Sequence, residues 1–233
     1  MPAKNSIKIS VENGYYHIYN RGVNKQEIFE NPQDYAVFLK YLKEALSPIE
    51  KSPDVKTFKV EVNGTIFTAV KRQPKNFFDK VSLIAYGLMP NHFHLMIRQN
   101  LKESMKDFVK SVTTRYSMYF NKSRGRVGPL FQGVYKAVLI ENENYLLHLS
   151  RYIHLNPREN FKTLADAYSS YADYIGKKKT SWLNPRPVLD YFKEPTNPEF
   201  KKINNYKDFV EKYNSDDEST GNSLESLILE SED

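Results

Sequence analysis

The sequence predicts an α+β domain in which helices pack on one face of a mostly antiparallel sheet. Strand-like and helix-like segments are mixed along residues 14–157. Two pairs of strand-like segments are joined by connections short enough for antiparallel neighbours. The longer helical segments each carry an apolar stripe, which is typical of helices that cover a sheet on one side.

The elements expected in chain order are a strand at 14–22, a helix at 31–46, a hairpin at 58–70, strands at 80–88 and 92–98, a helix at 100–121, a strand at 130–140 and a helix at 142–157. In the first strand, apolar and polar residues alternate imperfectly. Asn31 is the N-cap candidate of the first helix, and Pro32 suits its first position. Asn63-Gly64 tolerates the positive φ of a type I′ turn. Pro90 lies between the next two strands, where no ladder hydrogen bond is required.

The two later helices show a periodicity of three and four residues. In 100–121 the apolar stripe is Leu101, Met105, Phe108, Val112 and Tyr116, and a basic row on another face is Lys102, Lys106 and Lys110. In 142–157 the stripe is Leu146, Leu149 and Ile153, and Pro157 ends the pattern. The loop 122–128 is basic and expected to be flexible.

Composition divides the chain into three parts. Residues 1–175 form the expected domain, 176–213 a peripheral basic extension and 214–233 an acidic tail that is expected to be disordered. The tail holds seven acids and no Lys or Arg, so residues 1–213 contain 34 basic and 21 acidic side chains, a net charge of +13. No internal repeat is found.

Several classes of protein are excluded. The chain has no cysteine, which rules out disulfides and thiolate metal sites. Its first residues lack the apolar run of a signal peptide, and no segment is long enough to span a bilayer. A soluble, cytoplasmic protein without a membrane partner is therefore expected.

The basic body indicates a polyanionic partner, and 17 Tyr and 14 Phe are interleaved with its cations. Aromatic rings stack on unpaired bases while cations follow the phosphates, so we favour nucleic acid. Ordinary solubilising charge is the alternative.

Two histidines, His92 and His94, flank Phe93 in an otherwise apolar strand. Side chains two apart on a strand point to the same face, so both imidazoles can bind one divalent metal ion. Without cysteine, further ligands must be carboxylates, amides, water or substrate oxygens. Such an open site suits catalysis at a phosphate. Two structural histidines near a strand edge are the alternative.

The last helix offers a protein nucleophile. Tyr152 and Asn156 are four residues apart and share a helix face, with His148 one turn earlier. A tyrosine held over a metal-bearing strand could attack a phosphodiester, provided that its phenol is activated. Tyr116, Tyr119 and Tyr145 are also expected on helices, and water is an alternative nucleophile.

Three segments in this order resemble the single-tyrosine HUH transposases of small insertion sequences, and within them the branch of REP-associated tyrosine transposases. They are "GYYHIYNRGVNKQEIF", "MPNHFHLMI" and a long segment that ends in "RYIHLNP". The resemblance covers roughly residues 13–175. The family's His-hydrophobic-His motif is His92-Phe93-His94 in this chain.

The resemblance implies a ferredoxin-like, RRM-like sheet with the histidine pair on a central strand. It also implies a metal-dependent nick of single-stranded DNA by Tyr152, five residues before Pro157. The nick leaves a 5′-phosphotyrosine and a free 3′-hydroxyl, and the reaction can reverse on another end. Asn156 matches the residue that completes the metal or phosphate site. Mg²⁺ or Mn²⁺ is the expected cofactor, because Zn²⁺ risks too closed a site.

The expected partner is single-stranded DNA with hairpin or palindromic ends, and a homodimer is left open because the family contains monomers and dimers. The candidate DNA contacts are Arg21, Lys102, Lys106, Lys110, Arg115, Arg124 and Arg126. Residues 51–79 form a longer connection to the histidine strands than is usual in the family. This segment is expected to be either an insertion that reads DNA or a peripheral addition to the fold. A non-catalytic nucleic-acid-binding protein on the same fold and a water-using metal nuclease are the alternative functions.

Overall fold

The fold is described from a computed structural model, which places residues 9–49, 57–70, 73–193, 203 and 205–213. Its centre is a four-stranded antiparallel sheet in the order β4-β5-β1-β6. The strands are β1 (Tyr15–Arg21), β4 (Val81–Met89), β5 (His92–Gln99) and β6 (Lys136–Ile140). Helix α1 (Pro32–Leu46) follows β1, and α2 (Ser104–Ser123) follows β5. The resulting β-α-β-β-α-β order, with β5 and β1 central, confirms the predicted α+β, ferredoxin-like sheet.

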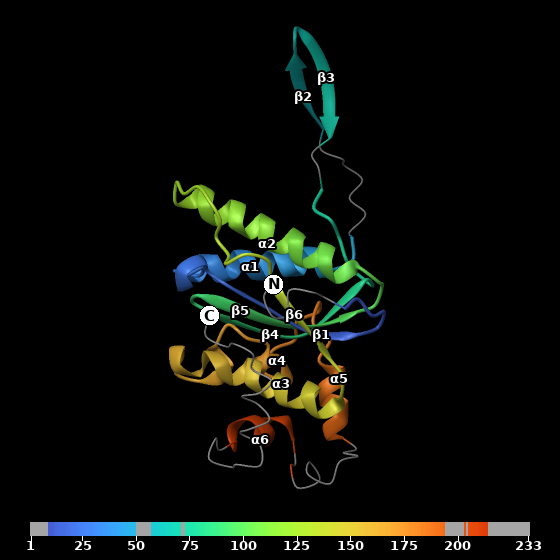
Figure 1. Ribbon diagram of the computed structural model, residues 1–233, viewed down its shortest axis with the longest axis vertical. Coiled ribbons are helices and arrows are strands. Elements are labelled where there is room, and N and C mark those ends of the chain that lie inside the picture. The colour runs from blue at the N-terminus through green and yellow to red at the C-terminus, as the bar shows by residue number, and fades with distance from the viewer. Residues whose placement is uncertain (1–8, 50–56, 71–72, 194–202, 204, 214–233) are drawn as a thin grey trace.

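The helices lie on both faces of this sheet, which corrects the expectation of a single covered face. Figure 1 shows α1 and α2 on one side of the strands and α3 (Glu143–Leu155) on the other. The central strands are buried on both faces, so both faces need a cover: Leu95 and Ile97 lie in one apolar cluster, and Met96 between them lies in the other. Helices α1 and α2 cover the first cluster, and α3 the second.

Helix α1 begins as its sequence predicts. The Asn31 side chain accepts a hydrogen bond from the backbone amide of Asp34, and Pro32 occupies the first turn. This cap satisfies one of the otherwise unpaired amides at the helix N-terminus. Phe38 and Leu42 of α1 are fully buried, and they pack with Phe108 and Val112 of α2 in the cluster over the sheet.

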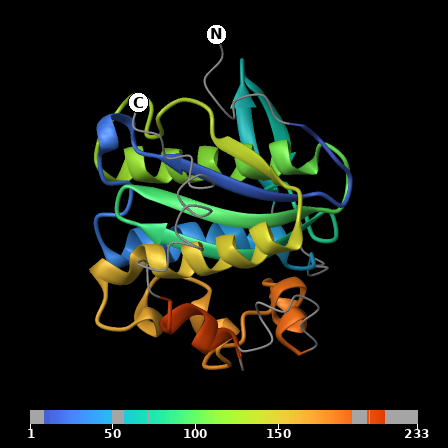
Figure 2. The same cartoon turned by 60° about the horizontal axis from the view of Figure 1, so that its bottom comes forward.

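The C-terminal part of the chain packs against α3 and along the edge strand β4 (Figure 2). It contains α4 (Tyr171–Tyr174), α5 (Arg186–Leu189) and α6 (Tyr206–Glu211), with short 3₁₀ turns η2 (Asn156–Asn160), η3 (Leu164–Asp166) and η4 (Asp190–Phe192). Val188, Phe209 and Val210 are buried in the same cluster as Ile153 of α3. Segments of 176–213 therefore support the helix that carries Tyr152. The domain boundary at residue 175 stays a prediction, and the acidic tail 214–233 lies outside the described residues.

The predicted hairpin forms a separate two-stranded sheet of β2 (Thr57–Val62) and β3 (Thr65–Val70). Asn63 and Gly64 both have positive φ, 50° and 77°, as a type I′ turn requires. The hairpin projects from the body beyond α2 (Figure 1). Phe58 and Phe67 on it are about half exposed, so its apolar alternation does not lead to burial in the sheet core.

Two predicted boundaries are wrong. Helix α2 begins at Ser104 because Glu103 has a left-handed φ of 65°, and the backbone amide of Met105 donates to the side chain of Gln99. Leu101 therefore lies outside the helix and is exposed. Strand β6 begins at Lys136 rather than 130, because Gly128 and Gly133 turn the chain with positive φ. Among the described helices, none combines the length and the apolar composition needed to cross a membrane.

Candidate active site

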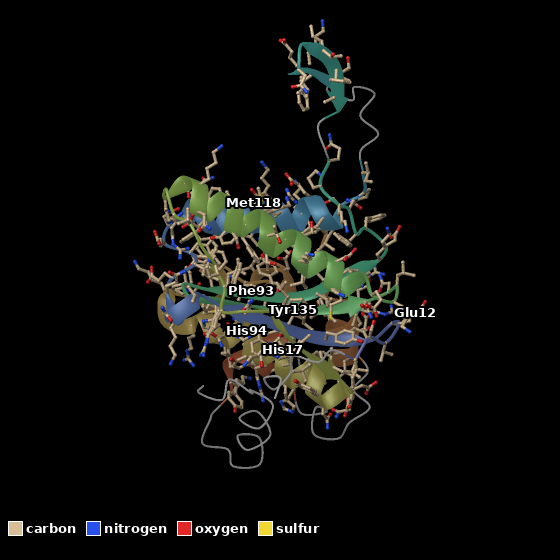
Figure 3. The ribbon with its side chains drawn as sticks, turned by 45° about the horizontal axis from the view of Figure 1, so that its top comes forward. Glu12, His17, Phe93, His94, Met118 and Tyr135 are labelled. Atoms are coloured by element: carbon tan, nitrogen blue, oxygen red, sulfur yellow. The ribbon has the colours of Figure 1, made fainter. Side chains whose placement is uncertain are left out.

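Strand β5 sends its histidines and its phenylalanine to opposite faces. Phe93 is fully buried in the cluster under α1 and α2, whereas His92 and His94 face α3. Figure 3 shows Phe93 on the α2 side of the strands and His94 on the other side. His94 is fully buried and His92 is half-buried. The two rings lie 5.1 Å apart, centroid to centroid, and are nearly perpendicular. The two imidazoles therefore lie side by side on the same face of the strand, as alternation predicts.

Helix α3 places Tyr152 and Asn156 against these histidines. Asn142 caps the helix by accepting from the amide of Tyr145, and the stripe Leu146, Leu149 and Ile153 is buried. The half-buried Tyr152 ring meets the His94 ring edge to face, with centroids 5.3 Å apart. Oδ1 of Asn156, at the C-cap, lies 3.3 Å from Nε2 of His92. One strand and one helix thus bring all four predicted residues together.

Gly87 of β4 permits this close approach of α3 to the sheet. It pairs with His94 across the β4–β5 ladder, so it lies beside the site. A Cβ at this position would be 2.6 Å from the carbonyl oxygen of Ile153, closer than real contacts allow. The missing side chain of Gly87 therefore sets how near Tyr152 comes to His94.

His92 is oriented by its neighbour in the β4–β5 turn. Its Nδ1 lies 2.6 Å from Oδ1 of Asn91, so the tautomer with a proton on Nδ1 donates to this amide oxygen. In that tautomer, Nε2 carries a lone pair and faces the oxygen of Asn156. Two electron-pair donors then face each other at 3.3 Å. Neighbouring ligands of an octahedral cation with bonds of about 2.1 Å lie about 3 Å apart, so this pair fits a shared cation.

His17 of β1 is part of the site and was not identified from the sequence. Its Nε2 lies 2.8 Å from Nδ1 of His94, and both rings are buried (Figure 3). Burial, with a smaller effect from His94, holds the pKa of His17 well below its ordinary value, so the ring is neutral. Tyr19 pairs with His94 in the β1–β5 register, and His17 is two residues before Tyr19. Strand alternation shows that His17 faces α3 once this register is known.

Within the described residues, no group of three or more His, Asp or Glu side chains is arranged to hold a metal. A cation at this site would have two imidazoles and one amide oxygen as protein ligands, with its remaining positions open. That donor set fits Mg²⁺ or Mn²⁺ that also binds a phosphate oxygen.

The predicted DNA-binding cations fall into two groups. Arg21 pairs with His92 in the β1–β5 register, and its Nε donates to Gln132. The others lie in α2 and its flanking loops, across the sheet from α3 (Figure 1): Lys102, Lys106, Lys110, Arg115, Arg124 and Arg126. The structure therefore brings Arg21 near the site and does not bring the other six there.

Several of these cations already have protein partners. Arg115 forms an ion pair with Glu44 and lies over the ring of Tyr41. Arg124 binds both Glu30 and the buried Asp34. These contacts tie α2 to α1 and give both arginines a structural role.

Part of the chain is similar to a known protein family. Residues 55–156, which include His92, His94, Tyr152 and Asn156, match the family model described as "Transposase IS200 like". No curated protein sequence matches the chain. Two solved structures are remotely similar. A REP-associated tyrosine transposase bound to a REP hairpin has a TM-score of 0.46 and 12% identity, over 76% of this chain and 95% of that one. A protein from Deinococcus radiodurans R1 that is assigned to the transposases has a TM-score of 0.34 and 14% identity, over 66% and 95%.

The family assignment depends on the matched segment, which contains both the histidine strand and the tyrosine helix. Residues 55–156 match the family of IS200-like transposases, so the resemblance inferred from the sequence motifs is confirmed.

Proposed function

We propose that this chain cleaves and rejoins single-stranded, hairpin-forming DNA through a covalent bond between Tyr152 and a 5′-phosphate. The observation that carries the proposal is the meeting of β5 and α3: the Tyr152 ring contacts His94, and Asn156 faces His92. Tyr152 is half-buried and its ring lies against His94, so its phenol remains accessible beside a candidate metal ligand, as a nucleophile requires.

His92, His94 and Asn156 would hold a divalent cation, Mg²⁺ or Mn²⁺. When bound, the cation polarises the scissile phosphate and neutralises part of its charge. All three protein ligands are neutral when they coordinate, so the charge of the cation is not offset by a carboxylate. The donor set therefore favours an anionic substrate such as a phosphodiester.

The proposed reaction exchanges one phosphate ester for another. The phenolic oxygen of Tyr152 attacks phosphorus and loses its proton, and the bond from phosphorus to the 3′ oxygen breaks. The 3′ oxygen takes up a proton and leaves as a hydroxyl. Because one phosphodiester replaces another, the reverse attack by a 3′-hydroxyl rejoins DNA without an external source of energy.

Arg21 is proposed as a backbone contact beside the site, because it lies opposite His92 on the neighbouring strand. The exposed lysines of α2 and its N-terminal flank, Lys102, Lys106 and Lys110, would serve DNA that passes the opposite side of the sheet. The homodimer stays a prediction.

The test uses a hairpin-forming single strand labelled at its 3′ end and, separately, at its 5′ end. With Mn²⁺, the wild-type chain is expected to give an adduct that survives denaturation with the 3′ label only, because the protein bonds to the downstream 5′-phosphate. Tyr152→Phe should abolish the adduct and leave DNA binding unchanged.

Tyr145→Phe is the matched control, since Tyr145 is another tyrosine of α3 and its hydroxyl is buried. It should retain the adduct. Cleavage without an adduct would overturn the proposal in favour of attack by water. Binding without cleavage by the wild-type chain would favour a non-catalytic nucleic-acid-binding protein.

A further inference from the structure

The buried pair of His17 and His94 has a role that the proposed reaction does not yet use. The two rings come from adjacent central strands and share one hydrogen bond of 2.8 Å between His17 Nε2 and His94 Nδ1. Their planes are inclined by only 23°, and Tyr19 packs against the His17 ring with centroids 4.9 Å apart. His17 is therefore fixed in position and in ring orientation.

The number of protons on this pair restricts its tautomers. Two neutral imidazoles carry two N–H protons, and charging either buried ring without a counter-ion is costly. One proton lies in the hydrogen bond between the rings. The second is on an outer nitrogen, either Nδ1 of His17 or Nε2 of His94. A proton on Nε2 of His94 would block that nitrogen as a ligand, whereas a proton on Nδ1 of His17 leaves it with a lone pair.

We propose that His17 is a positioning residue that accepts the Nδ1 proton of His94 and itself carries the outer proton, so that Nε2 of His94 is available to a divalent cation. The inference rests on the proposed role of His94 as a ligand. Metal-bound histidines almost always donate their second N–H to a carboxylate, a carbonyl or water, and that partner fixes the tautomer. His17 occupies this place with a neutral ring.

The neutral acceptor has a consequence for the substrate. A carboxylate beside His94 would add negative charge next to the cation and oppose the approach of a DNA phosphate. An imidazole orients His94 without adding charge. Nδ1 of His17 is buried and has no hydrogen-bond partner in the described part of the chain, so this ring is not held by a further polar network.

The first measurement is Mn²⁺ binding to the full chain without DNA, by calorimetry or electron paramagnetic resonance. His17→Phe keeps a flat ring of similar size but cannot accept a proton, and Mn²⁺ affinity is expected to fall about 10- to 100-fold. His17→Gln restores an acceptor oxygen and should recover most of the affinity. Equal affinity in all three proteins would overturn the inference.

The second measurement needs no variant, so it holds even if His17→Phe fails to fold. The wild-type chain is labelled with ¹⁵N at histidine, saturated with Mg²⁺ and examined by two-bond ¹H–¹⁵N correlation. His94 should be protonated at Nδ1, and His17 should also carry its proton at Nδ1. A proton on Nε2 of His17 would overturn the inference. Failure of the wild-type chain to bind either cation would instead remove the proposed metal site itself.

Discussion

Along β5, odd-numbered and even-numbered side chains enter two different environments. Phe93, Leu95 and Ile97 enter an apolar cluster under α1 and α2, where the Phe93 ring packs against Phe38 and Phe131. On the other face, His92 and His94 lie under α3. One strand therefore contributes to the apolar core from one face and to the candidate site from the other. A polar site can therefore exist in the sheet while the opposite face keeps the strand in register.

The α3 face also holds buried polar groups away from the site. Nδ1 of His154 lies 2.7 Å from the hydroxyl of Tyr206, and its Nε2 lies 2.7 Å from Oγ of Ser170. Tyr206 belongs to α6, which packs on α3, and Ser170 pairs with Tyr86 at the edge of the sheet. These hydrogen bonds satisfy a fully buried imidazole and join α3 to the C-terminal helices, so this layer depends on hydrogen bonds as well as on apolar contact.

The largest expected effect is on the apolar face. Phe93→Ala removes a fully buried ring between two other rings and leaves a cavity. The free energy of unfolding, measured by urea denaturation, should fall by about 3–5 kcal/mol. The histidines on the same strand are untouched, so the loss should be one of stability.

Phe58→Ala is the matched control, because Phe58 lies on the projecting hairpin and is 51% exposed. It should change the free energy of unfolding by less than about 1 kcal/mol. A similar loss in both variants would mean that the hairpin is as much a part of the core as the sheet is.

The next effect lies between the sheet and α3. Gly87→Ala places a methyl group against the carbonyl oxygen of Ile153, so α3 must move away from β4. Overpacking of this kind costs about 1–3 kcal/mol of stability. Because Tyr152 and Ile153 are adjacent, we expect adduct formation on the DNA substrate to slow by about 100-fold, as small misplacements of a reacting group do.

The stability of Gly87→Ala and its rate of adduct formation can change independently. An unchanged rate of adduct formation together with lower stability would show that the distance from α3 to the sheet does not control the approach of Tyr152 to His94. An unchanged stability would show that α3 adjusts without strain at this position.

Local signals predicted much of the fold. Asn31-Pro32 starts α1 and Asn63-Gly64 makes the hairpin turn, because capping and positive φ depend on neighbouring residues alone. Strand alternation also predicts that His92 and His94 share a face. That α3 lies across the sheet from α1 and α2 was not predicted, because alternation shows which side chains share a face but not which helix covers it.

Features that depend on tertiary contacts were missed. The start of α2 depends on Gln99, whose side chain accepts from the amide of Met105. The place of His17 in the site depends on the register of β1 against β5. Neither contact leaves a signal in the spacing of residues along the chain.

The smallest expected effect concerns pH and again separates the two faces. Burial lowers the pKa of His154 to about 3, whereas the unfolded value is about 6.5. The unfolded chain therefore binds more protons below pH 6.5, and stability must fall as the pH decreases towards the folded pKa. For this residue the loss between pH 7 and pH 5 is about 2 kcal/mol. His154→Gln should be less stable than wild type at pH 7. Between pH 7 and pH 5, its free energy of unfolding should fall by about 2 kcal/mol less than that of wild type, measured by urea denaturation at both pH values.

Tyr206→Phe separates titration from the lost hydrogen bond. It removes the hydroxyl that contacts Nδ1 of His154 but keeps the buried imidazole. Its stability should be lower than wild type at both pH values, with an unchanged loss between them. If Tyr206→Phe also flattened the pH dependence, the acid sensitivity would belong to the hydrogen-bonded group rather than to protonation of His154. All five histidines belong to β1, β5 or α3. The same experiment therefore tests whether the loss of stability at low pH comes from histidines of these elements and not from the apolar cluster that holds Phe93.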